Sequence, residues 1–167
     1  SKIVKKCIEN AVLAPTSSNL QLWEFFHITN KELLIKLSKT CFNQPAASTA
    51  KQIIVVVTRK DLWKKRANQN INFFDSKRDK LTKKQYDLTS KYYNKAVPLV
   101  YKDFLGIFSY LKYLFANFLG FFRVMYRQLR RSDTRIVAHK SAALASQNFM
   151  ISMAAFGYDT CPMEGFD

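Results

Sequence analysis

Hydrophobic positions along the chain change spacing between helical and strand-like patterns. Apolar residues in 2–13 recur every three or four positions, which predicts an amphipathic helix that Pro15 cannot continue. The stretch WEFFHIT (23–29) is short and rich in β-forming residues, so it predicts a strand. IIVVVT (53–58) is β-branched and apolar on both faces, which predicts a central, fully buried strand.

Helices are predicted for most of the remaining chain. Asn30 is a candidate N-cap for a helix over 31–42. Residues 59–98 are predicted helical, with a break near NQNINFFDS and an interruption at Pro98. The strongest helix covers 132–157, with Ser132 or Asp133 as a cap and Gly157 at its end. Its predicted packing face consists of Ala143, Ser146, Met150, Met153 and Ala154. Two strands among several helices predict an α+β fold, a modest sheet wrapped by helices in a single domain over 1–167.

Charge and length narrow the classes of protein that fit. The chain has 167 residues, of which 48% are hydrophobic, and this suits one compact domain. Its formal net charge of +15 favours anionic partners such as nucleic acid, anionic lipid or phosphorylated small molecules. Solvated lysines are the simpler explanation, and the lysine-rich part of 59–98 carries much of the excess charge.

Several kinds of site are excluded by composition. Three well-separated cysteines without a CxxC pair argue against a disulfide framework or a zinc site and predict a reducing, cytoplasmic compartment. With two histidines, a His-rich metal site is excluded. The four glycines form neither GxGxxG nor a P-loop, and GxSxG and HExxH are absent, so a P-loop enzyme or a hydrolase is excluded and no metal is assigned.

An aromatic segment at 101–131 stands out. Charged residues interrupt it, and its longest uncharged run of about ten residues is well short of the roughly 20 needed to span a bilayer. A helix lying on a membrane surface stays open, but a lid or a dimer contact is preferred. Its aromatic residues Phe104, Phe108, Tyr110 and Tyr113 could stack on a planar substrate or form ordinary core contacts.

Three polar segments interrupt apolar surroundings where regular elements meet loops. They are the N-terminal loop (15–21), the Asn43 loop (41–48) and the C-terminal tail (161–167). Each on its own could be a simple turn. The N-terminal loop is unusual because Thr16, Ser17, Ser18, Asn19 and Gln21 offer more hydrogen-bonding side chains than a turn needs.

Together these segments resemble a known family. APTSSNLQLW is similar to the A-P-[ST]-[SG]-x-N-x-Q-P-W segment of the FMN-dependent nitroreductases, with Leu22 in place of the usual proline. ASQNFMISMAAFGYDTCPMEGFD is similar to the second hallmark of that family, and NQPAASTAKQIIVVV fits the segment that leads into its apolar strand. The resemblance covers 2–58 and 132–167, whereas 59–131 is a helical aromatic and basic insertion that no motif covers.

The resemblance implies an FMN-dependent NAD(P)H oxidoreductase that forms an intertwined homodimer. Cofactor contacts are then expected from Asn43 at the pyrimidine edge, and Gly165 lets the backbone of the tail approach the ring. The other implied contacts are Pro162, Met163 and Glu164 of the tail and, from the partner subunit's N-terminal loop, Pro15, Thr16, Ser17 and Asn19. The implied reaction is ping-pong, because a nicotinamide reduces the flavin before a nitroaromatic, quinone or similar acceptor binds.

The resemblance also predicts features that this sequence does not contain. The family opens with an R-R-S-x-R type segment and ends with a basic stretch, and both grip the FMN phosphate. Here the sequence opens at SKIVKK and stops at Asp167, so it looks shortened at both ends and its phosphate ligands are not assigned. Two alternatives stay open: a reductive dehalogenase or flavin-processing enzyme on the same fold, and a basic protein that binds nucleic acid or membrane, for which no nucleic-acid motif is present.

Overall fold

The computed structural model describes residues 1–167, which divide into two compact units. The sheet unit contains Ser1–Ala14, Trp23–Val57 and Ala142–Asp167. The helical unit contains Pro15–Leu22 and Thr58–Ser141. The division falls inside the longest helix, α8 (Arg131–Ala155), whose last 14 residues belong to the sheet unit.

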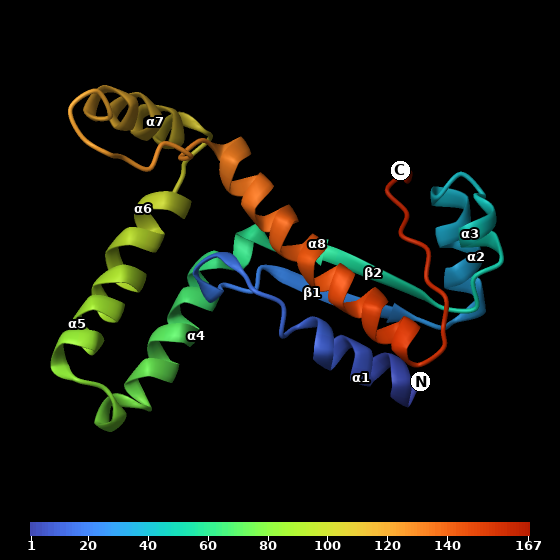
Figure 1. The fold of residues 1–167 in the computed structure, drawn as a ribbon. Helices are drawn as coiled ribbons and strands as arrows, with labels where there is room; N and C mark the ends of the chain where they lie inside the picture. Colours follow the sequence, from blue (N-terminus) through green and yellow to red (C-terminus); the bar gives the residue numbers. More distant parts are fainter. The chain divides into compact units, whose positions relative to one another are not determined.

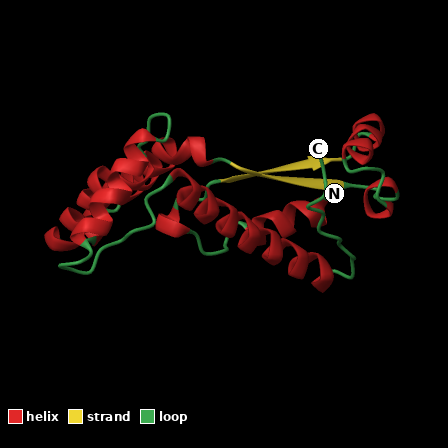
Figure 2. Ribbon diagram, turned by 90° about the horizontal axis from the view of Figure 1, so that it is seen from above, coloured by secondary structure: helices red, strands yellow, loops and turns green.

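The sheet consists of β1 (Trp23–Ile28) and β2 (Ile53–Thr58), close to the two strands that the sequence predicts (Figure 2). The strands are antiparallel. At one end His27 Nε2 lies 2.6 Å from Gln52 Oε1, and at the other the Arg59 N–H donates to the Leu22 carbonyl at 2.9 Å. At these two ends, a residue later in β1 lies opposite a residue earlier in β2, and the reverse. This is the pairing that antiparallel strands require.

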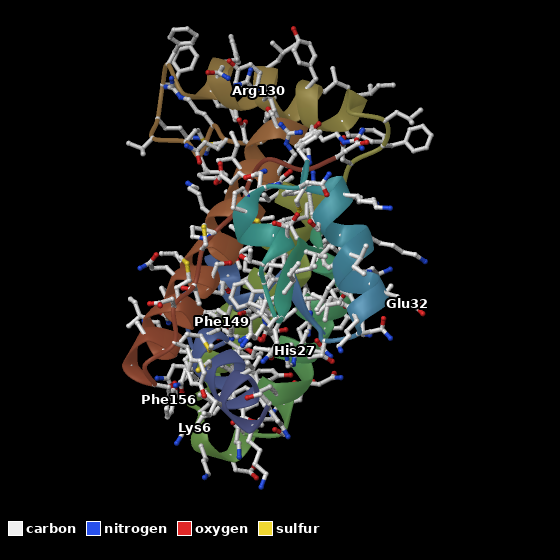
Figure 3. All side chains as sticks on the ribbon, turned by 90° about the vertical axis from the view of Figure 1, so that its right-hand side faces the viewer. Lys6, His27, Glu32, Arg130, Phe149 and Phe156 are labelled. Atoms are coloured by element: carbon white, nitrogen blue, oxygen red, sulfur yellow. The ribbon has the colours of Figure 1, made fainter.

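Two helices cover one face of this sheet, α1 (Lys2–Ala11) and the second half of α8 (Figure 1). Val4, Cys7 and Ala11 of α1 form a buried cluster with Phe149 and Met153, against Phe25 and Ile54 of the strands. The Lys6 ammonium lies 5.6 Å from the Phe156 ring, and both side chains are labelled in Figure 3. The predicted helix over 2–13 is thus confirmed, two residues shorter at its end.

The predicted packing face of α8 is confirmed for Met150 and Met153, which pack in the cluster with α1, and is wrong for Ala143 and Ala154. Ala143 and Ala154 are exposed, whereas Ala142, Ala145, Phe149 and Met153 are buried. These residues recur every three or four positions, and the two alanines let α8 approach Trp23 and Val56 closely. The sequence periodicity correctly predicted that small residues of α8 pack against the sheet. Because small residues also stand next to them in the sequence, the periodicity did not determine which side of the helix is buried.

The prediction that β2 is fully buried is also wrong. Only Ile53 is buried in β2, and the other five residues are half-buried. Ile54 and Val56 face the helices, so Val55 and Val57 lie on the opposite face because side chains alternate along a strand. With one neighbouring strand and one covered face, an apolar strand keeps half of its surface accessible.

Helices α2 (Lys31–Thr40) and α3 (Pro45–Ser48) connect the two strands. Asn30 is the N-cap of α2, and its Oδ1 accepts the Leu33 N–H at 3.0 Å, as predicted. At the end of α8, Gly157 has φ +78°, the Tyr158 N–H donates to the Met153 carbonyl, and the Gly157 N–H donates to the Ala154 carbonyl. This is a Schellman motif, and it confirms Gly157 as the residue that ends the helix.

The helical unit is built around α4 (Trp63–Asp75), α5 (Lys83–Lys91), α6 (Val97–Tyr101) and α7 (Ile107–Leu119). A π-helical turn (Tyr92–Ala96) joins α5 to α6. These three segments form one continuous helical rod from Lys83 to Tyr101, and the rod packs beside α4 (Figure 1). Three short 3₁₀ turns, Ser17–Asn19, Lys60–Leu62 and Arg78–Lys80, complete the unit. Its buried core consists of Leu20, Leu22, Ala67, Tyr93, Val97, Tyr101 and Ala138.

One predicted interruption of these helices is confirmed and the other is wrong. Helix α4 continues through most of NQNINFFDS, where Ile71 and Phe74 pack against the core. It ends at Asp75 with Ser76 as its C-cap, so the break lies at the end of that stretch. Pro98 lies in the first turn of α6, where its missing N–H costs little, and the wide π turn directly before it keeps the chain helical. No helix of the structure combines the length and the apolar character needed to cross a membrane.

Tyr101 makes the stability of the helical unit depend on pH. Its ring stacks on Trp63 with centroids 6.1 Å apart, and burial raises the pKa of its phenol from 10.0 to about 12. The fold prefers the neutral phenol, so this stabilisation is complete below pH 10.0 and is lost as the pH rises towards 12. We expect Tyr101→Phe, measured by urea unfolding, to lose less free energy of unfolding than the wild type over that range. Parallel pH profiles for the two proteins would contradict this.

Candidate functional site

Two of the three polar segments contact each other in the sheet unit. The Gln44 side-chain Nε2 donates to the Gly165 carbonyl at 2.8 Å, and the Asp167 N–H donates to the Thr40 carbonyl at 2.9 Å. The C-terminal tail therefore returns from the end of α8 to the region of α2 and α3 (Figure 1). Residues separated by 121 positions in sequence become neighbours.

The Asn43 loop has an uncommon backbone that exposes its amide side chain. Phe42 and Asn43 have φ of +56° and +51°, the left-handed region that asparagine tolerates better than most residues. The Asn43 N–H is held by the Ser38 carbonyl at 2.8 Å, which fixes the turn. The Asn43 side chain is exposed and makes no hydrogen bond within the chain, so its amide can both donate to and accept from a ligand.

A cavity of about 400 Å³ adjoins Asn43. The cavity is lined by parts of α2, α3 and the loop around them. The lining residues are Lys31, Leu34, Ile35, Ser38, Lys39, Asn43, Ala47, Ser48 and Ala50, and most of the surface that they present to the cavity is apolar. Ser38 Oγ is buried and has no hydrogen-bond partner. The Asn43 amide thus lies beside a largely apolar surface that also carries the side chains of Lys31, Lys39 and Ser48.

The C-terminal tail presents backbone donors more than side chains. Pro162, Glu164 and Gly165 are exposed and Met163 is half-buried, and none of them is in a helix or strand. The N–H groups of Met163, Glu164 and Gly165 have no partner in the chain. A Cβ atom on Gly165 would lie 3.0 Å from Gln44 Nε2, so a side chain there would crowd the contact that holds the tail.

The N-terminal loop belongs to the helical unit, and much of its hydrogen bonding is internal to that unit. Thr16 Oγ1 accepts the Gln21 N–H at 3.2 Å. The Ser18 hydroxyl is 2.7 Å from the Tyr92 hydroxyl, and the Tyr93 hydroxyl donates to the Ser18 carbonyl at 3.0 Å. These contacts hold a backbone in which Ser18, Asn19 and Gln21 all have positive φ. Part of the excess of polar side chains is therefore explained by local structure.

Three residues of this loop keep their side chains available. Pro15, Ser17 and Asn19 are exposed, and the side chains of Ser17 and Asn19 make no hydrogen bond within the chain. Asn70 Nδ2 donates to the Asn19 backbone carbonyl at 2.9 Å, and this hydrogen bond fixes the orientation of the Asn19 backbone. Thr16 accepts a hydrogen bond, so its own hydroxyl proton is free to be donated.

A family model, described as the nitroreductase family, matches residues 2–167. The chain belongs to the nitroreductase family. This match includes residues 59–131, where the sequence motifs gave no resemblance. It confirms the family and the fold class that the motifs predicted.

Among curated proteins, the nitroreductase chain is 29% identical to protein DrgA of Synechocystis sp. over 163 residues, which are 98% of this chain and 60% of DrgA. Similar solved structures include a candidate NAD(P)H:FMN oxidoreductase from Staphylococcus epidermidis (TM-score 0.70, 19% identity, 99% of this chain and 64% of that one). Another, from Exiguobacterium sibiricum, was solved in complex with FMN (TM-score 0.59, 24% identity, 98% and 63%). The chain spans about three fifths of the length of the curated relatives it matches.

Sequence reasoning missed Gln44 as a residue of this site. The residue follows Asn43 in the NQ pair, which the motif contains, but the contact with Gly165 depends on the path of the tail. The site residues named from the motifs, from Pro15 to Gly165, stay predictions. The single-domain assignment stays one as well.

Gln44→Ala tests whether this hydrogen bond holds the tail. An exposed hydrogen bond contributes about 1 kcal/mol, so the global free energy of unfolding should fall by no more than that. Amide hydrogen exchange at Asp167, whose N–H bonds to Thr40, should become several-fold faster. Gln52→Ala is the matched control, because Gln52 is an exposed amide that contacts His27 instead. Equal exchange rates at Asp167 in both variants would contradict the proposed tether.

Proposed function

We propose that this nitroreductase is an FMN-dependent NAD(P)H oxidoreductase that reduces nitroaromatic compounds, quinones or related acceptors. The observation that carries the proposal is the Gln44–Gly165 hydrogen bond, which joins the Asn43 loop to the C-terminal tail in a member of this family. FMN in one solved relative and NAD(P)H in the names of others support the choice of cofactors. We propose a homodimer as its working form, following the family pattern.

The donors present in the sheet unit fit an isoalloxazine ring. Such a ring is apolar on its faces and has hydrogen-bonding atoms along one edge and at N5. The exposed amide of Asn43 suits the edge, because it can match both N–H and carbonyl groups. The unpartnered N–H groups of Glu164 and Gly165 suit a ring nitrogen, and Gly165 has no side chain that would keep the ring away.

In the proposed homodimer, the N-terminal loop of the partner subunit would contribute contacts to the FMN site. Ser17 and Asn19 have free polar side chains, and Thr16 has a hydroxyl proton to donate. Their backbone is already fixed by Tyr92, Tyr93 and Asn70 in the loop's own unit. A loop ordered before it meets a ligand loses little conformational entropy on binding, which favours affinity.

FMN, when bound, supplies the two-electron redox chemistry of the reaction. The chain's part is to bind the ring, to orient it through backbone and amide donors, and to leave one face open for the nicotinamide and acceptor. We assign no general acid or base. Glu164 has an exposed carboxylate, and its backbone N–H is the group that fits the site. Three free cysteines are consistent with a reducing, cytoplasmic compartment.

Removal of the Asn43 amide should weaken FMN binding. Asn43→Gly is the sharpest change, because glycine tolerates the φ of +51° and the backbone of the loop is not strained. We expect the Kd for FMN to rise about tenfold, as the loss of one or two hydrogen bonds predicts. Fluorescence quenching of added FMN measures this, and Asn10→Ala, an exposed amide on α1, is the control. An unchanged Kd would exclude Asn43 from the site.

Gly165→Val tests the approach of the tail to the ring. Added carbons would meet the end of the flexible Gln44 side chain, which can move, so the protein should fold. FMN binding should be lost, and the purified protein should be colourless, whereas the wild type should be yellow and should bleach with NADH or NADPH. Circular dichroism checks that the fold is intact. A yellow variant with ordinary affinity would place the flavin elsewhere, and turnover of halogenated instead of nitro or quinone acceptors by the wild type would indicate a dehalogenase.

A further inference from the structure

Helix α7 exposes an apolar face to solvent. Six of its residues are 47–63% exposed and form one continuous stripe: Ile107, Phe108, Leu111, Leu114, Phe115 and Phe118. Their spacing of one, three and four positions puts them on one side of the helix. Phe121 and Phe122 follow directly and are more exposed still. We call the six helical residues the apolar face of α7.

The charged side chain of α7 points away from the apolar face and into the protein. Lys112 is the only charged residue between Ile107 and Leu119, and its ammonium donates to the carbonyls of Leu99 and Lys102 at 2.7 and 2.8 Å. It thereby satisfies the carboxyl end of α6, where unpaired carbonyls accumulate. Ser109 and Ala116, on the same side as Lys112, are buried. The helix thus has its polar side inward and its apolar side outward, which is the reverse of a helix that faces water.

Basic side chains flank the apolar face at both ends. The segment from Leu99 to Arg131 contains six basic residues and one acidic residue, which gives it a net charge of +5. Of the six, Lys112 points inward and Arg130 pairs with Asp133 at 3.5 Å, so the flanks are Lys102, Arg123, Arg127 and Arg131. The acidic residue, Asp103, is occupied locally, because its carboxylate accepts the N–H groups of Gly106 and Ser109 at 3.1 and 2.9 Å. The Arg123 side chain, by contrast, is exposed and makes no hydrogen bond or ion pair in the structure.

We infer that α7 docks on an anionic membrane surface, lying in the plane of the interface. An apolar stripe with aromatic residues and flanking positive charge suits the boundary between lipid headgroups and acyl chains. The positive residues complement anionic headgroups, and the inward Lys112 leaves no charge to be buried in the apolar layer. The 13-residue helix is too short to span a bilayer.

Charge complementarity favours lipid over a second copy of the chain as the occupant. Another copy would bring the same +5 segment to the contact, and like charges at an interface oppose association. A lipid surface matches the apolar face and the basic flanks together. This inference does not depend on the proposed oxidoreductase activity.

Vesicle flotation of the purified protein tests the inference. The protein should float with vesicles of equimolar phosphatidylcholine and phosphatidylglycerol, and weakly with phosphatidylcholine alone. Binding should fall as salt shortens the Debye length from about 10 Å to about 3 Å. Phe115→Asp should lower vesicle partitioning about tenfold, because it puts a charge on the apolar face. Phe73→Asp is the matched control, since Phe73 lies on α4 and is 58% exposed against 63% for Phe115.

A second pair of variants separates the charge contribution. Arg123→Glu should reduce partitioning about tenfold or more, because each charge near the surface contributes about fivefold. Lys65→Glu, on the exposed side of α4, should reduce it less. The inference is overturned if the protein does not float with anionic vesicles, or if Phe73→Asp and Phe115→Asp reduce binding equally. It is also overturned if Phe115→Asp changes the mass in solution, measured by light scattering, while vesicle binding is unchanged, because the face would then join two copies.

Discussion

The close packing of α8 on the two-stranded sheet determines where the candidate site can form. Ala142 and Ala145 allow the helix axis to approach β1 and β2, and Phe149 and Met153 then fill the space shared with α1. The position of the helix end follows from this packing, and Gly157 turns the chain there. The tail is thereby directed back to α2 and α3, where Gln44 and Thr40 hold it. A larger residue at Ala145, which is fully buried, would displace all of these parts together.

The candidate site relies on backbone geometry more than on reactive side chains. Asn43 is in a left-handed conformation, the tail has free N–H groups, and Gly165 provides room. Such features suit the binding and orientation of a planar cofactor that carries its own chemistry, as we propose for FMN. A protein that works in this way needs few acidic or nucleophilic residues near the cofactor, which agrees with a sequence that has 12 acidic residues and two histidines.

Features fixed by neighbouring residues were predicted well. Both strands, the Asn30 cap and the Gly157 turn follow from local preferences, and the structure has all of them. Features that depend on packing were missed. The polar NQN stretch gave no indication that Ile71 and Phe74, just after it, pack against the core and hold α4. The burial of β2 depends on how many faces of the sheet are covered, which its own sequence does not determine. Motifs predicted Asn43 and Gly165 as residues of the candidate site, and both stay predictions. The hydrogen bond that joins their two segments through Gln44 required the path of the tail.

The π-helical turn at Tyr92–Ala96 holds the conformation of the N-terminal loop, and this depends on the register of the rod that contains the turn. Two consecutive tyrosines reach the same serine: Tyr92 bonds to the Ser18 hydroxyl and Tyr93 to the Ser18 carbonyl. In a regular α-helix, consecutive side chains diverge by about 100°, so both contacts tie the loop to one register of the rod. A change in this register would therefore rotate both phenols away from Ser18 and release the loop.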